Sequence, residues 1–167
     1  VSKPGGSGVV VGEGWAAGVA LPGVGAVGLT RAACPELKRQ AGSVVNIAGV
    51  GGRTPGAQFT SGGSVNAALL SFTKALADVG VRDGVQGKAS KPGTGHTDRL
   101  NRRLAADAAE KGTAMAGAAA ELVRSANITR LGEAEDIASL VSYIAGPGGR
   151  LLQGSLIDMD GGQTKTI

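Results

Sequence analysis

The chain holds few side chains that could carry out acid–base or nucleophilic chemistry. His96 is its single histidine, and histidine is the residue type that most often transfers protons in catalysis. The hydroxyls of Thr60, Ser61 and Ser64 lie close together, but no activating base accompanies them in the sequence. Tyr143 falls in an apolar helical segment and is predicted to be a core aromatic. His96 thus remains as a candidate proton donor or acceptor, beside the simpler interpretation of a loop histidine.

Metal centres and disulfides are not expected. Cys34 is the single cysteine, which excludes a disulfide framework and a cysteine-based metal site. A lone histidine removes histidine-clustered metal sites and argues against a Ser–His–Asp triad. The sequence therefore predicts no metal.

Composition indicates one globular domain over residues 1–167. Hydrophobic residues make up 42% and charged residues 18% of the chain, as in folded proteins with a packed core. The net charge is +4, but the basic residues are scattered apart from Arg99, Arg102 and Arg103, and aromatic residues that could stack on bases are not interleaved with them. No signal pattern or membrane-spanning run is evident. We expect a cytoplasmic protein that binds neither nucleic acid nor membrane.

Apolar periodicity outlines the elements that must position any site. A helix is predicted over 29–40, with a kink at Pro35, and is followed by a buried strand over 43–48. A second helix carries Val65, Leu69, Phe72 and Leu76 on one face.

The second half continues the same alternation of strands and helices. Residues 85–90 would be a poor strand, because Gly87 and Lys88 stand where a buried strand carries apolar residues. A polar helical segment over 98–126 should break at Gly112. A helix opening near Glu133 and ending at Gly146, and a last strand over 156–159, complete the series. This alternation predicts an α/β fold with a parallel sheet.

Four segments together resemble the short-chain dehydrogenase/reductase family. They are similar to its fifth strand, the helix that begins at its catalytic lysine, its Arg-x-Gly-x-Pro-Glu-Asp-Ile-Ala stretch and its last strand with an Asp-Gly-Gly ending. In this chain they are residues 42–47, 66–77, 130–138 and 153–162. The resemblance implies a Rossmann-like doubly wound parallel sheet, here lacking its first half, with residues 1–5 following the family's fourth strand.

The resemblance also places the family's catalytic positions. In the family a tyrosine exchanges a proton with the substrate, a lysine lowers its pKa, a serine polarises the carbonyl and an asparagine completes a relay. The serine, tyrosine and lysine positions fall, without a gap, on Gly49, Gly62 and Asn66, and the asparagine position falls on Pro22. None of these four residues can perform the family's role, so the catalytic positions are predicted to be incompetent.

Cofactor features survive in part. The Pro-Gly-x-x-x-Thr pattern after the family's sixth strand is present, and the resemblance implies NAD or NADP as cofactor. The cofactor-binding positions that it implies are Gly5, Ala48, Pro92, Gly93, Gly95 and Thr97. A tight turn after a strand explains the same pattern equally well. Gly8, Gly12 and Gly14 have the spacing of a dinucleotide turn, but no strand can precede them, which favours a glycine-rich loop.

The string Ser-Lys-Pro-Gly occurs at 2–5 and again at 90–93. If both copies stand at strand ends, Lys3 and Lys91 could attract an anionic ligand there. Chance recurrence in a glycine-rich chain is the alternative.

Three interpretations stay open. The chain is a partial or imperfectly assigned stretch of an NAD(P)-dependent oxidoreductase acting on a small carbonyl or alcohol substrate. It is a non-catalytic relative that serves as a scaffold or oligomer partner. Or its site has moved to His96 or a hydroxyl. By resemblance we expect a homo-oligomer, a dimer or a tetramer, whereas residues 98–126 carry no pattern that specifies the substrate.

Overall fold

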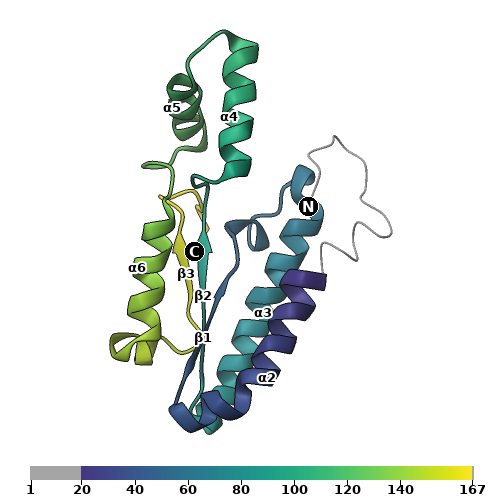
Figure 1. Cartoon of the computed structure of the whole chain (residues 1–167), viewed down its shortest axis with the longest axis vertical. Helices are drawn as coiled ribbons and strands as arrows, with labels where there is room; N and C mark the ends of the chain where they lie inside the picture. The colour runs from purple at the N-terminus through teal and green to yellow at the C-terminus, as the bar shows by residue number, and fades with distance from the viewer. Residues whose placement is uncertain (1–19, 167) are drawn as a thin grey trace.

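The computed structural model describes residues 20–166, apart from the side chains of Leu21, Pro22 and Gln58. Three parallel strands, β1 (Ser43–Ile47), β2 (Gln86–Pro92) and β3 (Leu156–Met159), form a sheet in the order β1-β2-β3. Helices cover both faces of this sheet, as Figure 1 shows. The α/β prediction with a parallel sheet is therefore confirmed.

Two long helices cover one face and a shorter helix covers the other. Helices α2 (Gly25–Gln40) and α3 (Thr60–Asp83) lie on one face, and α6 (Ala134–Ala145) packs against β1 and β2 from the opposite face. Short helical turns η1 (Ala20–Val24), η2 (Val50–Gly52), η3 (Ala57–Phe59) and η4 (Pro147–Leu152) join these elements. The core between α3 and the sheet contains Ala48, Leu69, Leu70 and Ala89.

Helices α4 (Asp98–Lys111) and α5 (Met115–Ala126) form a hairpin that projects beyond the carboxyl ends of the strands (Figure 1). The predicted break at Gly112 is confirmed, since this glycine ends α4 with a φ of 62°. The hairpin has a hydrophobic cluster of its own. Its buried members are Leu100, Leu104, Ala108, Ala118, Ile128 and Leu131.

Strand β2 forms in spite of the two residues that argued against it. A Cβ at position 87 would lie 3.1 Å from the backbone nitrogen of Ala77, so glycine allows α3 to approach the sheet closely. Lys88 is buried on the other face, where its ammonium donates to the Ile144 carbonyl at the end of α6, 2.6 Å away. The prediction of a poor strand was wrong because each residue has a tertiary partner that the sequence does not reveal.

Two further expectations are corrected. Helix α2 continues through Pro35 to Gln40, and it begins at Gly25, earlier than predicted. Tyr143 is 61% exposed on the outer side of α6 and is not a core residue. No helix among residues 20–166 is both long and apolar enough to cross a membrane. Gly5, Lys3 and the glycines at 8, 12 and 14 lie outside the described residues.

Candidate functional site

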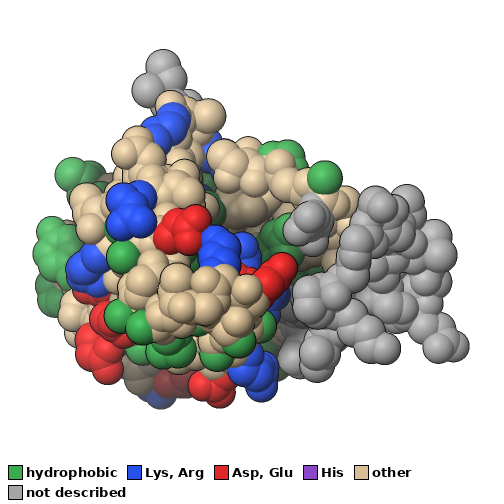
Figure 2. Space-filling view, turned by 90° about the horizontal axis from the view of Figure 1, so that it is seen from above, with side chains coloured by type: hydrophobic (Ala, Val, Ile, Leu, Met, Phe, Trp, Pro, Cys, Tyr) green, Lys and Arg blue, Asp and Glu red, His purple; other side chains and the backbone are tan. Residues whose placement is uncertain are grey.

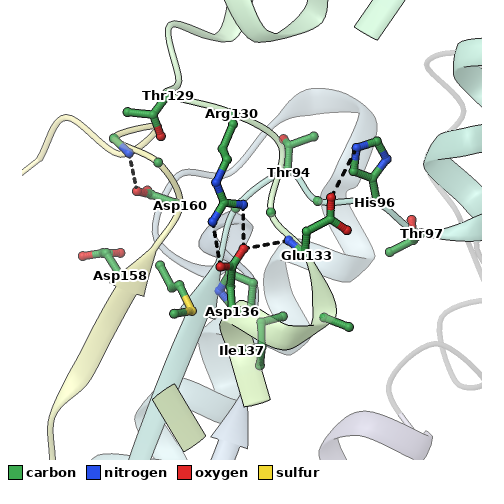
Figure 3. Close-up of a pocket in the computed structure, with 18 residues that line it drawn as sticks. Thr94, His96, Thr97, Thr129, Arg130, Glu133, Asp136, Ile137, Asp158 and Asp160 are labelled. Carbon is green, nitrogen blue, oxygen red and sulfur yellow. Dashed lines mark hydrogen bonds and ion pairs between the residues drawn. The ribbon is translucent and has the colours of Figure 1, made fainter. Parts of the chain in front are cut away.

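A cavity of about 470 Å³ lies at the carboxyl ends of β2 and β3. Parallel sheets bind ligands at this end, and the volume falls within the usual range for small-molecule sites. Three segments line it, namely residues 92–97, residues 129–137 with the start of α6, and residues 158–162 (Figure 3). The cavity brings together four of the predicted cofactor positions. These are Pro92, Gly93, Gly95 and Thr97.

The loop after β2 is fixed by backbone contacts that require its glycines. A Cβ on Gly93 would lie 2.6 Å from the Cβ of Asp160, and a Cβ on Gly95 would lie 2.9 Å from the carbonyl oxygen of Gly132. The N–H of His96 donates to that same Gly132 oxygen over 2.8 Å, and the Gly132 N–H donates to the Thr94 carbonyl over 3.1 Å. Close packing thus accounts for both glycines of this loop, Gly93 of the Pro-Gly-x-x-x-Thr pattern and Gly95 within it, whatever they bind.

Thr97 is the N-cap residue of helix α4. Its hydroxyl oxygen accepts a hydrogen bond from the backbone N–H of Leu100 over 3.1 Å, which is a standard N-cap. A hydroxyl that accepts in this way keeps its own proton for donation. The capping contact is therefore compatible with the predicted cofactor contact of Thr97, which stays a prediction.

The charged groups of the cavity are mostly carboxylates. Arg130 makes two hydrogen bonds of 2.7 Å to Asp136, and these bonds, with one from the Glu133 backbone, lower the pKa of Asp136 to about 2. Burial raises the pKa of Asp160, but hydrogen bonds from Thr164 and from neighbouring backbone N–H groups outweigh it and hold that pKa below its usual value. Both carboxyl groups are ionised at neutral pH.

Asp158, at the edge of the cavity, has a buried partner. Its carboxylate lies 2.7 Å from the ammonium of Lys91, whose side chain is 1% exposed. An ammonium that is buried and paired in this way has no free charge to offer an anionic ligand. The expectation that Lys91 attracts an anion was therefore wrong.

His96 stands at the rim of the cavity beside the first residue before α6 (Figure 3). Its Nε2 lies 3.7 Å from the Glu133 carboxylate, and its Nδ1 lies 3.3 Å from Oδ1 of Asn101. The side chain is 38% exposed. The histidine that the sequence singled out thus faces a carboxylate and lines the cavity.

The family's catalytic positions form a second, adjoining group. A Cβ on Gly49 would lie 3.5 Å from the Asn66 amide nitrogen and 3.7 Å from the Pro92 carbonyl oxygen, so these three residues meet. Ala48, just before them, is fully buried and donates its N–H to the Ser90 carbonyl over 3.0 Å. Pro22 lies in η1. Pro92 also lines the cavity, so the two groups are neighbours.

Phe59 lies at the family's catalytic positions, and sequence analysis did not identify it as a residue of the candidate site. A Cβ on Gly62 would overlap the Phe59 ring, which therefore covers the position that the resemblance assigns to tyrosine. Arg99, in the first turn of α4, lies 5.8 Å from the centre of the same ring. The neighbouring hydroxyl of Ser64 donates to the Thr60 carbonyl over 2.9 Å. The one signal in the sequence that could have pointed to Phe59 is its position three residues before Gly62.

Sequence comparison finds relatives of this chain. A sequence model of the family described as enoyl-(acyl carrier protein) reductase matches residues 9–164. An uncharacterised oxidoreductase of Mycobacterium tuberculosis is 33% identical over 138 residues, which cover 81% of this chain and 49% of that protein. The NADPH-dependent reductase BacG of Bacillus subtilis is 24% identical over 139 residues, which cover 83% of this chain and 54% of that protein.

Solved structures share the fold. L-sorbose reductase from Gluconobacter frateurii, complexed with NADPH and L-sorbose, superposes with a TM-score of 0.91 at 20% identity over 99% of this chain and 65% of its own. An NADPH-bound short chain oxidoreductase from Pseudomonas aeruginosa, described as containing an atypical catalytic center, gives 0.83 at 22% identity over 94% and 60%. The chain belongs to the short-chain dehydrogenase/reductase family, and it spans about half the length of the curated relatives that it matches.

Proposed function

We propose that the chain is part of an NAD(P)-dependent oxidoreductase that interconverts a small carbonyl compound and its alcohol. The observation that carries this proposal is the cavity at the carboxyl ends of β2 and β3, bounded by the Pro92–Thr97 loop. Family membership and the NADPH named for BacG and for the sorbose reductase support the cofactor class.

The cavity suits one end of such a cofactor better than the other. Its lining includes the carboxylates of Glu133, Asp136, Asp158 and Asp160 and one guanidinium, that of Arg130. Phosphate groups would be repelled there, whereas a nicotinamide ring with its carboxamide and ribose hydroxyls carries donors that carboxylates accept. The nicotinamide end therefore fits these residues, and the phosphates must be held elsewhere.

The Pro92–Thr97 loop has a defined role in binding this cofactor. A bound nicotinamide supplies or accepts the hydride. The Thr97 hydroxyl, whose proton is free, would hold the carboxamide, and the loop that Gly93 and Gly95 allow to pack closely fixes the position of that hydroxyl.

Cofactor binding tests this part of the proposal. NADH and NADPH are titrated into the protein while nicotinamide fluorescence is followed, and each reduced cofactor is then incubated with small ketones and sugars. Thr97→Val removes the hydroxyl and should weaken binding about tenfold, the value of one hydrogen bond, whereas the control Thr97→Ser keeps it. Equal affinities for the two variants, or no binding to the unaltered protein, would reject the role given to this loop.

A second candidate function is a non-catalytic relative that serves as a scaffold or oligomer partner. Phe59 favours it, because its ring covers the position where the family's tyrosine would begin. This second function is tested with one combined variant. It carries Gly49→Ser, Gly62→Tyr, Asn66→Lys and Phe59→Ala. If the unaltered protein binds cofactor without turnover and the combined variant turns over, the scaffold function holds. Turnover by the unaltered protein would exclude it.

A further inference from the structure

We propose that His96 is the proton donor and acceptor of this cavity, in place of the tyrosine that Gly62 cannot supply, and that Glu133 stabilises its charged form. The inference rests on the proposed function. It starts from the observation that the single histidine of the chain lines the cavity, on the loop that carries the predicted cofactor positions. The described residues hold no other histidine.

The backbone fixes both partners of this pair. Residues 95 and 132 form a parallel bridge, and the His96 N–H donates to the Gly132 carbonyl over 2.8 Å. One residue further, Glu133 caps α6, with its own N–H donating to Asp136 over 2.8 Å and its side chain accepting from the Asp136 backbone. The imidazole and the carboxylate therefore face each other from two anchored segments, as Figure 3 shows.

Asn101 selects the tautomer of the ring. Its Oδ1 lies 3.3 Å from Nδ1 of His96, and an amide oxygen can only accept, so Nδ1 carries the proton in the neutral imidazole. The lone pair is then on Nε2, which points toward Glu133 at 3.7 Å. That separation is too long for a direct hydrogen bond, so Nε2 is not committed to Glu133 before a ligand binds.

The carboxylate can stabilise a charged imidazole ring without being hydrogen-bonded to it. When Nε2 takes a proton from an alcohol, the imidazolium lies opposite the Glu133 carboxylate, which stabilises its charge. Catalytic contacts of this kind are often long before the ligand binds. At 38% exposure the ring also reaches solvent, so the proton can leave to water.

The step balances in both directions. In reduction, the Nε2 proton passes to the carbonyl oxygen, and the hydride that the reduced nicotinamide class of cofactor supplies passes to the carbonyl carbon. The products are the alcohol, the oxidised cofactor and a neutral imidazole, which water protonates again. The oxidation of an alcohol follows the same path in reverse. No group at positions 49, 62 or 66 takes part.

A binding measurement tests the geometry without reference to turnover. Because the chain has one histidine, a protein labelled with 15N-histidine gives a single imidazole spectrum. We expect the unaltered protein to show the Nδ1-protonated tautomer, and we expect its Nε2 resonance to shift when nicotinamide mononucleotide and a small alcohol are added. Glu133→Gln should change the Nε2 resonance, whereas Glu135→Gln, the same change at an exposed position of α6, should leave it unaltered. A spectrum that neither ligand nor Glu133→Gln changes would overturn the proposal.

Turnover gives the second test. His96→Ala should lower kcat by about 10²–10⁴, the usual value for a general acid–base residue, and free imidazole should restore part of the loss. A structural role would not be rescued in this way. Glu133→Gln should lower kcat by less and leave KM nearly unchanged. If the unaltered protein turns over and His96→Ala does so at a similar rate, this inference fails while the proposed function stands. If the unaltered protein binds cofactor but never turns over, the proposed oxidoreductase function fails with it.

Discussion

Lys88 carries an ammonium group into the interior of the sheet. Its side chain is buried, and the ammonium donates to the Ile144 carbonyl and to the side chain of Gln86. Burial, with a smaller contribution from Arg150, lowers the pKa of Lys88 below its ordinary value of 10.5. A lowered pKa means that the folded chain holds this proton less tightly than the unfolded chain does.

The pH dependence of stability follows from that difference. At a pH below the folded-state pKa of Lys88, folding carries the full cost of the buried charge. This cost disappears as the pH rises toward 10.5, where the unfolded chain also loses the proton. We expect the stability of the unaltered protein to rise over this interval relative to Lys88→Met. Urea unfolding of both proteins at several pH values measures it, and Lys74→Met, at an exposed position of α3, is the control. A pH-independent difference between the unaltered protein and Lys88→Met would contradict the prediction.

Single residues show where sequence reasoning ends. His96 was identified because a lone histidine is conspicuous, and the structure places it in the cavity. Phe59 was not, because its contact with Gly62 depends on how η3 turns into α3. Lys88 led to the prediction of a poor strand. Its hydrogen bond to the Ile144 carbonyl joins β2 to α6, and a contact between elements that are distant in the sequence leaves no local pattern.

Among the elements, α6 has the best-defined beginning. Glu133 and Asp136 form a reciprocal capping box, and Asp136 also pairs with Arg130. Because this box holds the segment opposite His96, the stability of α6 and the geometry of the candidate site are linked.

Removing the Asp136 charge should show this link. The bonds from Arg130 and the Glu133 backbone lower the pKa of Asp136 to about 2, below its usual 3.8. Its contribution to stability is therefore present above pH 3.8 and is lost as the pH falls through about 2. We expect Asp136→Asn to lower the Tm at neutral pH. Near pH 2 the Tm of this variant should approach the Tm of the unaltered protein. Circular dichroism melts at pH 7 and pH 2 measure this. A constant difference in Tm between these pH values would show that Asp136 contributes nothing through its charge.

The ends of α6 could be predicted because acids before a helix and Gly-Pro after it act locally. The course of α2 could not, since packing along the sheet holds the helix together through Pro35. For β2, the propensities of Gly87 and Lys88 were outweighed by contacts with α3 and α6. Local signals therefore located the elements, and tertiary contacts decided the exceptions.

At the scale of the whole molecule, apolar side chains remain at the surface. Leu29 on α2 and Val81 on α3 are more than two-thirds exposed, and Leu151 in η4 is 97% exposed. Ile47, at the end of β1, is 47% exposed, and among the described residues β1 pairs with β2 alone. Exposed apolar groups and an unpaired strand edge both favour association with another chain. Figure 2 shows acidic and basic side chains interspersed over the α4–α5 end, in contrast to a single basic patch.

We therefore expect the 167-residue chain to self-associate in solution. Size-exclusion chromatography with light scattering over a range of concentrations should give a dimer or larger species, and Leu151→Glu should shift the distribution toward smaller ones. A monomer with a sharp, concentration-independent melt would contradict this expectation. The homo-oligomer implied by family resemblance stays a prediction until that measurement is made.

The separate cluster within the α4–α5 hairpin bears on how such proteins diversify. Residues such as Leu104 and Ile128 pack within the hairpin, and the bridge between Gly95 and Gly132 closes its base. A segment that is closed at its base and filled by its own side chains can accumulate substitutions, or be exchanged for another hairpin, without disturbing the sheet. The shape of this end of the molecule can then evolve, or be engineered, separately from the folding of the sheet.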